Sequence, residues 1–231
     1  YKLFFNLLVK KIRAILTDVD ATIMDNRERR IKAVEMVLGV KIEDDQRAKA
    51  YNALTVEDVA RIAGVDPSDR VLEDIINIFL DDIELYELDT PAEGAVEIFN
   101  DLARNGIKII YVTGRPGVNY IRPFIEKMGF PLGPMYYERI TGVGAAEIKK
   151  SLFKKALIEN KLKPSEVVSL GDMPHDGAAS RCLNIYSIGT TQISGVSPEV
   201  LKPYFDEVIM HISSLPTLIR KLEKESSQRK T

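Results

Sequence analysis

Short apolar runs alternate with amphipathic helical segments along most of the chain, and this alternation restricts the folds open to it. The runs at 12–16, 107–112, 167–170 and 185–188 are almost wholly apolar, as are strands that a parallel sheet buries on both faces. A segment with helical periodicity follows each run. The alternation predicts an α/β fold whose core is a doubly wound, mainly parallel, Rossmann-like sheet.

One long region departs from the alternation. Residues 25–89 contain helical patterns, such as 27–38, and no convincing strand. Within the region, Thr55 to Asp58 has the spacing of a capping box, and Thr90 to Glu93 then resembles the start of another helix. We expect a small all-helical cap domain inserted after the first strand, which could act as a lid. The expected division is a core of residues 1–24 and 90–231 and a cap of residues 25–89.

Composition and charge limit the partners and the cellular compartment that we expect. The chain of 231 residues has a formal net charge of −2 and no stretch long and apolar enough for a membrane span. We therefore expect neither a nucleic acid nor a membrane as partner. The single cysteine, Cys182, excludes an intrachain disulfide and favours the cytoplasm. The expected oligomeric state is a monomer or a homodimer.

Polar motifs follow three of the predicted strands, at the point where each strand ends. They are Asp18-Val19-Asp20-Ala21-Thr22, Thr113-Gly114-Arg115, and Gly171-Asp172 with Asp176. Ligands of an open α/β sheet bind at the carboxyl ends of its strands. We therefore expect the three motifs to form one site.

The acids of that site are Asp18, Asp20, Asp172 and Asp176. Four carboxylates at one edge repel one another, so a divalent cation is their natural counter-charge. Hard oxygen ligands favour Mg²⁺. A cation with converging donors suits a phosphoryl group, whose transition state carries spread negative charge.

These motifs resemble those of the haloacid dehalogenase superfamily of phosphatases. The segment Asp18 to Thr22 is similar to the family's first motif, Asp-x-Asp-x-Thr, although many members have Gly in place of Ala21. Thr113 resembles the second motif, Lys149 the third, and Gly171-Asp172 with Asp176 the fourth. The place of the insertion, between the first two motifs, resembles the helical-cap subgroup, which includes phosphoglycolate phosphatases and β-phosphoglucomutases.

The resemblance implies a role for each residue. Asp18 would attack phosphorus and form an aspartyl-phosphate, and Asp20 would act first as general acid and then as general base. The phosphate would be held by Thr113, Gly114 and Lys149. Mg²⁺ would be bound by Asp18, the backbone carbonyl of Asp20, and Asp172, while Asp176 would bind it through water or orient Lys149.

The expected function is therefore Mg²⁺-dependent hydrolysis of a small phosphorylated metabolite, a phosphate monoester. A phosphomutase of the same chemistry and a catalytically silent phosphate-binding or interaction protein are the alternatives. Several assignments stay open: Lys150 competes with Lys149, Arg115 either touches substrate or lies in an exposed loop, and His175 has no clear role.

Overall fold

A six-stranded parallel sheet forms the centre of the protein, which we describe from a computed structural model over residues 11–115, 117–140 and 144–228. The strand order is β5-β4-β1-β6-β7-β8, so the first strand lies in the middle. Every pairing within this sheet is parallel, which confirms the predicted α/β fold class. The strands are β1 (Ala14–Thr17), β4 (Lys108–Thr113), β5 (Met135–Tyr137), β6 (Val167–Gly171), β7 (Tyr186–Thr190) and β8 (Glu207–Ile209).

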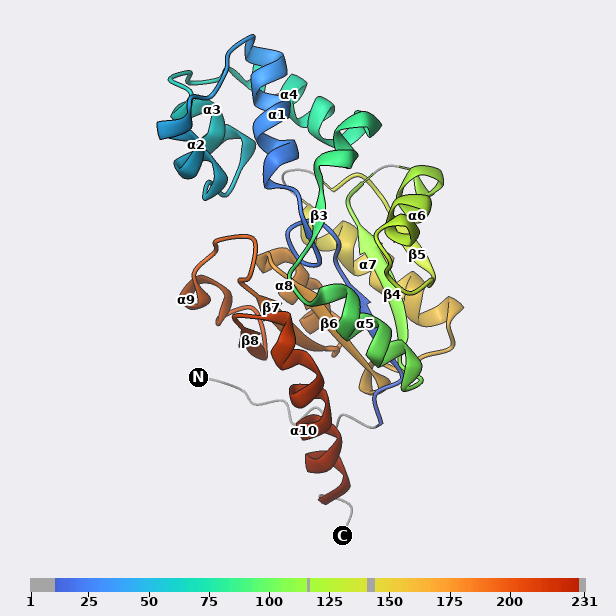
Figure 1. The fold of residues 1–231 in the computed structure, drawn as a ribbon. Helices are drawn as coiled ribbons and strands as arrows, with labels where there is room; N and C mark the ends of the chain where they lie inside the picture. Colours follow the sequence, from blue (N-terminus) through green and yellow to red (C-terminus); the bar gives the residue numbers. More distant parts are fainter. Residues whose placement is uncertain (1–10, 116, 141–143, 229–231) are drawn as a thin grey trace.

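Helices cover both faces of the sheet (Figure 1). The side chains of the central strands alternate between two hydrophobic clusters: Ile15 joins one face, and Leu16 the other. Helices α5 (Ala95–Arg104), α6 (Val118–Lys127) and α10 (Leu215–Gln228) pack in the Ile15 cluster. Helices α7 (Ala145–Glu159) and α8 (Pro174–Cys182) pack in the Leu16 cluster. The short α9 (Pro198–Leu201) and the 3₁₀ turns Pro164–Glu166 and Ile212–Ser214 complete the core.

Four further helices lie apart from the sheet, at the top of Figure 1. They are α1 (Arg27–Leu38), α2 (Asp44–Tyr51), α3 (Val56–Ile62) and α4 (Asp69–Asp81), followed by the 3₁₀ helix η1 (Ile83–Leu88). These helices share a hydrophobic cluster of their own, which includes Val34, Val59 and Ile75. We call residues 27–88 the helical segment.

A two-stranded antiparallel ribbon joins the helical segment to the sheet. Its strands are β2 (Met24–Asp25) and β3 (Thr90–Pro91), with Asp25 opposite Thr90. The expectation that Thr90 begins a helix is therefore wrong, and α5 begins only at Ala95. The physical reason is tertiary: pairing with β2 keeps Thr90 and Pro91 extended.

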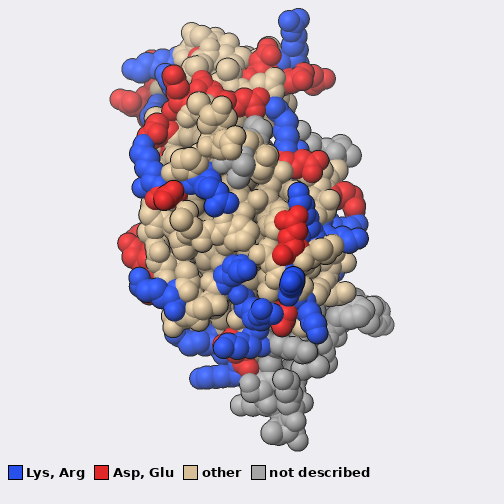
Figure 2. Space-filling model, turned by 90° about the vertical axis from the view of Figure 1, so that its right-hand side faces the viewer, with Lys and Arg blue, Asp and Glu red and all other residues tan. Residues whose placement is uncertain are grey.

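Lys and Arg side chains lie among Asp and Glu side chains over the face shown in Figure 2. Among the residues that the structure describes, no helix has both the length and the apolar character needed to cross a membrane.

Candidate active site

The three polar motifs lie at the ends of three adjacent strands. Strand β1 is paired on one side with β4 and on the other with β6, and Thr17 lies opposite both Tyr111 and Leu170. Asp18, Thr113 and Asp172 therefore leave the sheet side by side at its carboxyl edge. The backbone N–H of Asp18 still donates to the carbonyl of Leu170, at 2.9 Å, so the sheet itself fixes the start of the first motif.

Lys149 reaches this edge from the first turns of α7. Its side chain is 1% exposed, and its ammonium forms ion pairs with Asp18 and, at 3.0 Å, with Asp176. It also donates to the carbonyl of Val112 at 3.1 Å. Burial disfavours the ammonium, but Asp176 and Asp18 raise the pKa of Lys149 above its ordinary value. Lys149 is therefore charged at neutral pH and fixed between two acids.

The other oxygen of Asp18 faces a second acid. The hydroxyl of Thr22 lies 3.3 Å from Oδ2 of Asp18 and 3.0 Å from Oδ1 of Asp172. Burial raises the pKa of Asp18 to about 7, against the opposing effect of Lys149. Burial and the neighbouring carboxylates raise the pKa of Asp172 well above its ordinary value. Two buried carboxyl groups thus share one hydroxyl, and no described cation forms an ion pair with Asp172.

Asp18 and Asp172 together offer oxygen donors of the kind that a divalent cation takes, and both acids are buried. Within residues 11–115, 117–140 and 144–228, no three His, Cys, Asp or Glu side chains together form a group that could hold a metal. Lys149 forms ion pairs with both Asp18 and Asp176, and two arginines pair with Asp20. Asp172 has no ion-pair partner among the described residues, so the ionised forms of Asp18, Asp172 and Asp176 would share the single positive charge of Lys149. Mg²⁺ uses few carboxylates and keeps several waters.

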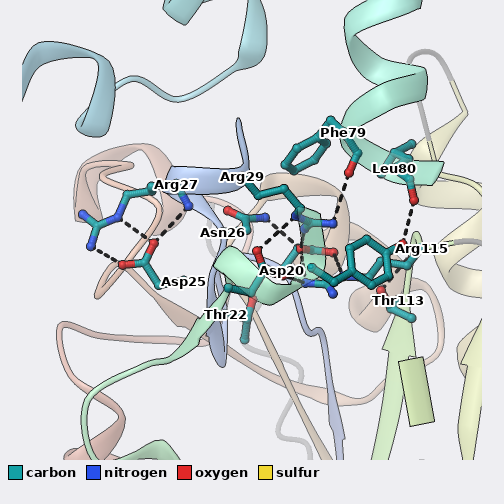
Figure 3. A network of polar contacts seen from close by, with 12 residues as sticks. Asp20, Thr22, Asp25, Asn26, Arg27, Arg29, Phe79, Leu80, Thr113 and Arg115 are labelled. Carbon is teal, nitrogen blue, oxygen red and sulfur yellow. Dashed lines mark hydrogen bonds and ion pairs between the residues drawn. The ribbon is translucent and has the colours of Figure 1, made fainter. Parts of the chain in front are cut away.

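Asp20 lies in a dense ion-pair network (Figure 3). Its carboxylate accepts four side-chain hydrogen bonds: one from Asn26 at 2.8 Å, one from Arg29, and two from Arg115 at 2.7 and 2.8 Å. Burial alone would raise the pKa of Asp20, but Arg115 and Arg29 hold it below its ordinary value. In this arrangement Asp20 is a carboxylate that accepts hydrogen bonds.

A second acid balances the charge of the two arginines. Asp89 has a fully buried side chain, lying 2.5 Å from Nη2 of Arg115 and 3.1 Å from Nε of Arg29. The guanidinium of Arg29 also lies over the Phe79 ring, at 4.3 Å from its centroid. We call Asp20, Arg29, Asp89 and Arg115 the buried tetrad; its two acids and two bases link the helical segment to the sheet edge.

Residues 15–190, more than half of the chain, match the haloacid dehalogenase-like hydrolase family. The chain belongs to this family. No curated protein is significantly similar to the chain in sequence.

Solved structures agree with this fold. A predicted phosphatase from Clostridium acetobutylicum superposes with a TM-score of 0.70 at 17% identity, covering 92% of this chain and 100% of its own. A predicted phosphoglycolate phosphatase from Haemophilus somnus gives 0.64 at 14% identity, with 90% and 97% covered. A phosphonoacetaldehyde hydrolase-like protein from Oleispira antarctica gives 0.65 at 12% identity, with 95% of each chain covered. At such identities these likenesses show the fold alone.

Two positions, Gly171 and Ala21, explain how this haloacid dehalogenase-like hydrolase packs its motifs. A Cβ at Gly171 would lie 2.5 Å from the Cβ and Cγ of Asp176, so glycine lets that acid approach the strand end. Ala21 has a φ of 54°, in the left-handed region that glycine adopts without strain. The Gly common in the family at this position has a physical basis in the turn between Asp20 and Thr22.

The remaining predicted residues lie around this centre. Thr113 is fully buried and its hydroxyl accepts from the backbone N–H of Arg115 at 3.2 Å, with half-buried Gly114 between them. Nε2 of His175 lies 3.9 Å from Asp176, and burial lowers the pKa of His175 below its ordinary value. Lys150 does not reach the edge: it pairs with Glu147 on the surface at 2.6 Å.

Sequence reasoning missed Arg29 and Asp89 and left Arg115 undecided. An exposed loop position for Arg115 is wrong, because its side chain is fully buried. The sequence held one signal for Arg29: it lies four residues before the apolar Ala33 and so shares its helix face, and the structure buries both. Arg115 directly follows the second motif, and Asp89 ends the predicted insertion.

Proposed function

We propose that this hydrolase is a Mg²⁺-dependent phosphatase that cleaves small phosphate monoesters through an aspartyl-phosphate on Asp18. The observation that carries the proposal is the environment of Asp18: Lys149 contacts one carboxylate oxygen, and the other faces Thr22 and Asp172. A nucleophilic carboxylate needs an oxygen free to attack phosphorus and neighbouring cations that neutralise the incoming phosphoryl charge.

In the first step, a carboxylate oxygen of Asp18 bonds to phosphorus as the bond to the alcohol oxygen breaks, and the leaving oxygen takes a proton from solvent or from a protonated Asp20. Lys149 and the backbone around Thr113 and Gly114 stabilise the phosphoryl oxygens. Asp18 and Asp172 would hold Mg²⁺, which supplies positive charge to the transferring group when bound. In the second step, water attacks phosphorus, the bond from phosphorus to Asp18 breaks, and inorganic phosphate leaves.

The contacts that Asp20 makes suit a general base, which the second step requires. As a carboxylate with lowered pKa it can accept a proton from the attacking water. To protonate a leaving alcohol it must first carry a proton itself, which the two arginines oppose. We infer that Asp20 serves mainly as the base, and as an acid only when contacts to the arginines are released.

Phosphate release from a panel of phosphate esters tests the proposal. We expect hydrolysis in the presence of Mg²⁺, loss of hydrolysis in EDTA, and inhibition by Ca²⁺, whose looser and larger coordination sphere would misplace Asp18. Full activity in metal-free buffer would overturn the metal assignment. Absence of hydrolysis of every ester would overturn the phosphatase assignment.

A further inference from the structure

Arg30, on the first turns of α1, is a buried cation for which the described residues supply no counter-ion. The residue is 6% exposed, and its Nη1 donates to the carbonyl of Leu54. The Nε and Nη2 atoms are also buried, and no described residue accepts a hydrogen bond from either of them. Burying a guanidinium with unsatisfied donors is costly unless an anion compensates it.

Acidic side chains compensate the neighbouring arginines of the same helix. Arg27 pairs with Asp25 at 2.5 Å, and Arg29 pairs with Asp20 and Asp89. Among the residues that the structure describes, no acid lies within ion-pair distance of Arg30. A shortage of acids does not explain this, because Asp25, Asp58 and Asp172 are near enough to favour its charged form.

The two free nitrogens have a specific geometry. Nε and Nη2 lie on one edge of the planar guanidinium, with their N–H bonds nearly parallel. This edge matches the two oxygens of a carboxylate or of a phosphate, which it can bind through two hydrogen bonds. The opposite side of the group is already used by Leu54.

Arg30 also lies close to the catalytic edge. Its backbone N–H donates to the carbonyl of Asn26, whose side chain contacts Asp20. Leu54 faces the core loop that follows β7, where its Cδ2 would be 3.6 Å from a Cβ at Gly195. The guanidinium therefore lies where the helical segment meets the core, on the side of Asp172.

We propose that Arg30 binds a carboxylate of the substrate, so that the preferred substrates are phosphate monoesters of hydroxy carboxylic acids. A carboxylate suits the site better than a second phosphate: its single charge matches that of one guanidinium, and Asp25 and Asp172 oppose any excess negative charge. This inference rests on the proposed phosphatase function and specifies its substrate class.

The test compares matched esters with and without a carboxylate. Phosphoglycolate is compared with hydroxyethyl phosphate, phosphoglycerate with glycerol phosphate, and p-nitrophenyl phosphate serves as a generic substrate. The proteins are the wild type, Arg30→Gln, Arg30→Lys and the control Arg61→Gln. Arg61 is a surface arginine of the helical segment, with a side chain 54% exposed.

We expect the wild type to prefer the carboxylated member of at least one pair. Arg30→Gln should lower kcat/KM for that ester by about 10- to 100-fold, the scale of hydrogen bonds to a charged group, mainly through KM. The neutral partner and p-nitrophenyl phosphate should change by only a few-fold. Arg30→Lys keeps the charge and a donor for Leu54 but lacks the two-pronged edge, so it should recover only part of the loss. Arg61→Gln should match the wild type.

Two results would overturn the inference while leaving the phosphatase function intact. One is a wild type that hydrolyses p-nitrophenyl phosphate without preferring either carboxylated ester. The other is an equal loss for all esters in Arg30→Gln and Arg30→Lys, which would mean that Arg30 holds the transferred phosphoryl group or only supports the fold. A wild type that hydrolyses no ester would instead overturn the phosphatase function itself, and this inference with it.

Discussion

Lys149 contacts three acceptors at the catalytic edge, and its removal would leave Asp18 and Asp176 without their shared cation. We predict that Lys149→Ala lowers kcat by roughly 10²-fold or more, the usual effect of one preorganised electrostatic group. Steady-state assays at saturating Mg²⁺ check this, because they separate weakened metal binding from lost charge stabilisation.

The same helix supplies the controls. Lys154 and Lys155 are exposed, and the half-buried Lys150 pairs with Glu147 away from the catalytic edge, so the alanine variants of all three should stay within a few-fold of the wild type. Loss of activity in Lys150→Ala together with full activity in Lys149→Ala would contradict the site described above.

The two arginines at Asp20 lead to a kinetic prediction. If Asp20 acts mainly as the base for water, Asp20→Asn should slow the second step by roughly 10²- to 10⁴-fold and spare the first step for a good leaving group. Stopped-flow measurement with p-nitrophenyl phosphate should then show a burst of one nitrophenolate per enzyme, followed by slow turnover. A slow reaction without a burst would place Asp20 in the first step.

The raised pKa of Asp18 predicts how stability depends on pH. A carboxyl whose pKa rises on folding, from 3.8 to about 7, favours the folded state at low pH and loses that contribution as pH rises through this window. In EDTA, the wild type should therefore lose stability across the window by on the order of 2–4 kcal/mol relative to Asp18→Asn. Urea unfolding at the two ends of the window measures the difference. Equal pH dependence in both proteins would contradict the assignment.

At the scale of elements, the buried tetrad connects α1, the residue that follows η1, and the loops after β1 and β4. Asp89→Asn would leave Arg29 and Arg115 buried with only Asp20 to compensate them. We predict a loss of about 3–5 kcal/mol in the free energy of unfolding, the usual effect of removing one partner from a buried ion pair. Urea unfolding measures it.

Asp81 provides a matched control, because it pairs with Arg139 on the surface with its side chain 47% exposed. Asp81→Asn should cost about 1 kcal/mol or less. Equal losses in the Asp81 and Asp89 variants would mean that the tetrad contributes no more than a surface ion pair.

Local sequence signals predicted some element boundaries and failed at others. The capping box at Thr55 is present: its hydroxyl accepts from the N–H of Asp58 at 3.0 Å, and Asp58 accepts in return at 3.1 Å. The similar pattern at Thr90 failed because its outcome depends on pairing with Asp25, far away in the sequence. A cap formed within four residues can be predicted locally, whereas a ribbon between distant segments cannot.

At the scale of the whole molecule, the order of motifs was enough to predict the sheet edge on which Asp18, Thr113 and Asp172 meet. The sequence did not reveal how charges pair across that edge, because Arg29, Asp89 and Arg115 come from three separate segments. The burial of Arg30 could not be predicted from the hydrophobic pattern. Arg30 lies four residues before Val34, on the apolar face of α1, but periodicity alone treats a charged residue as exposed. The division into core and cap, and closure of the helical segment as a lid, stay predictions.

Detection of a phosphoryl group on Asp18 tests the central claim most directly. The wild type, Asp20→Asn and Asp18→Asn proteins are mixed with Mg²⁺ and p-nitrophenyl phosphate, quenched in acid, digested and analysed by mass spectrometry. We predict a phosphorylated peptide containing Asp18, most abundant in Asp20→Asn, and neither phosphopeptide nor turnover in a folded Asp18→Asn protein. Near-wild-type turnover of Asp18→Asn, or a phosphoryl group on another residue, would contradict the account.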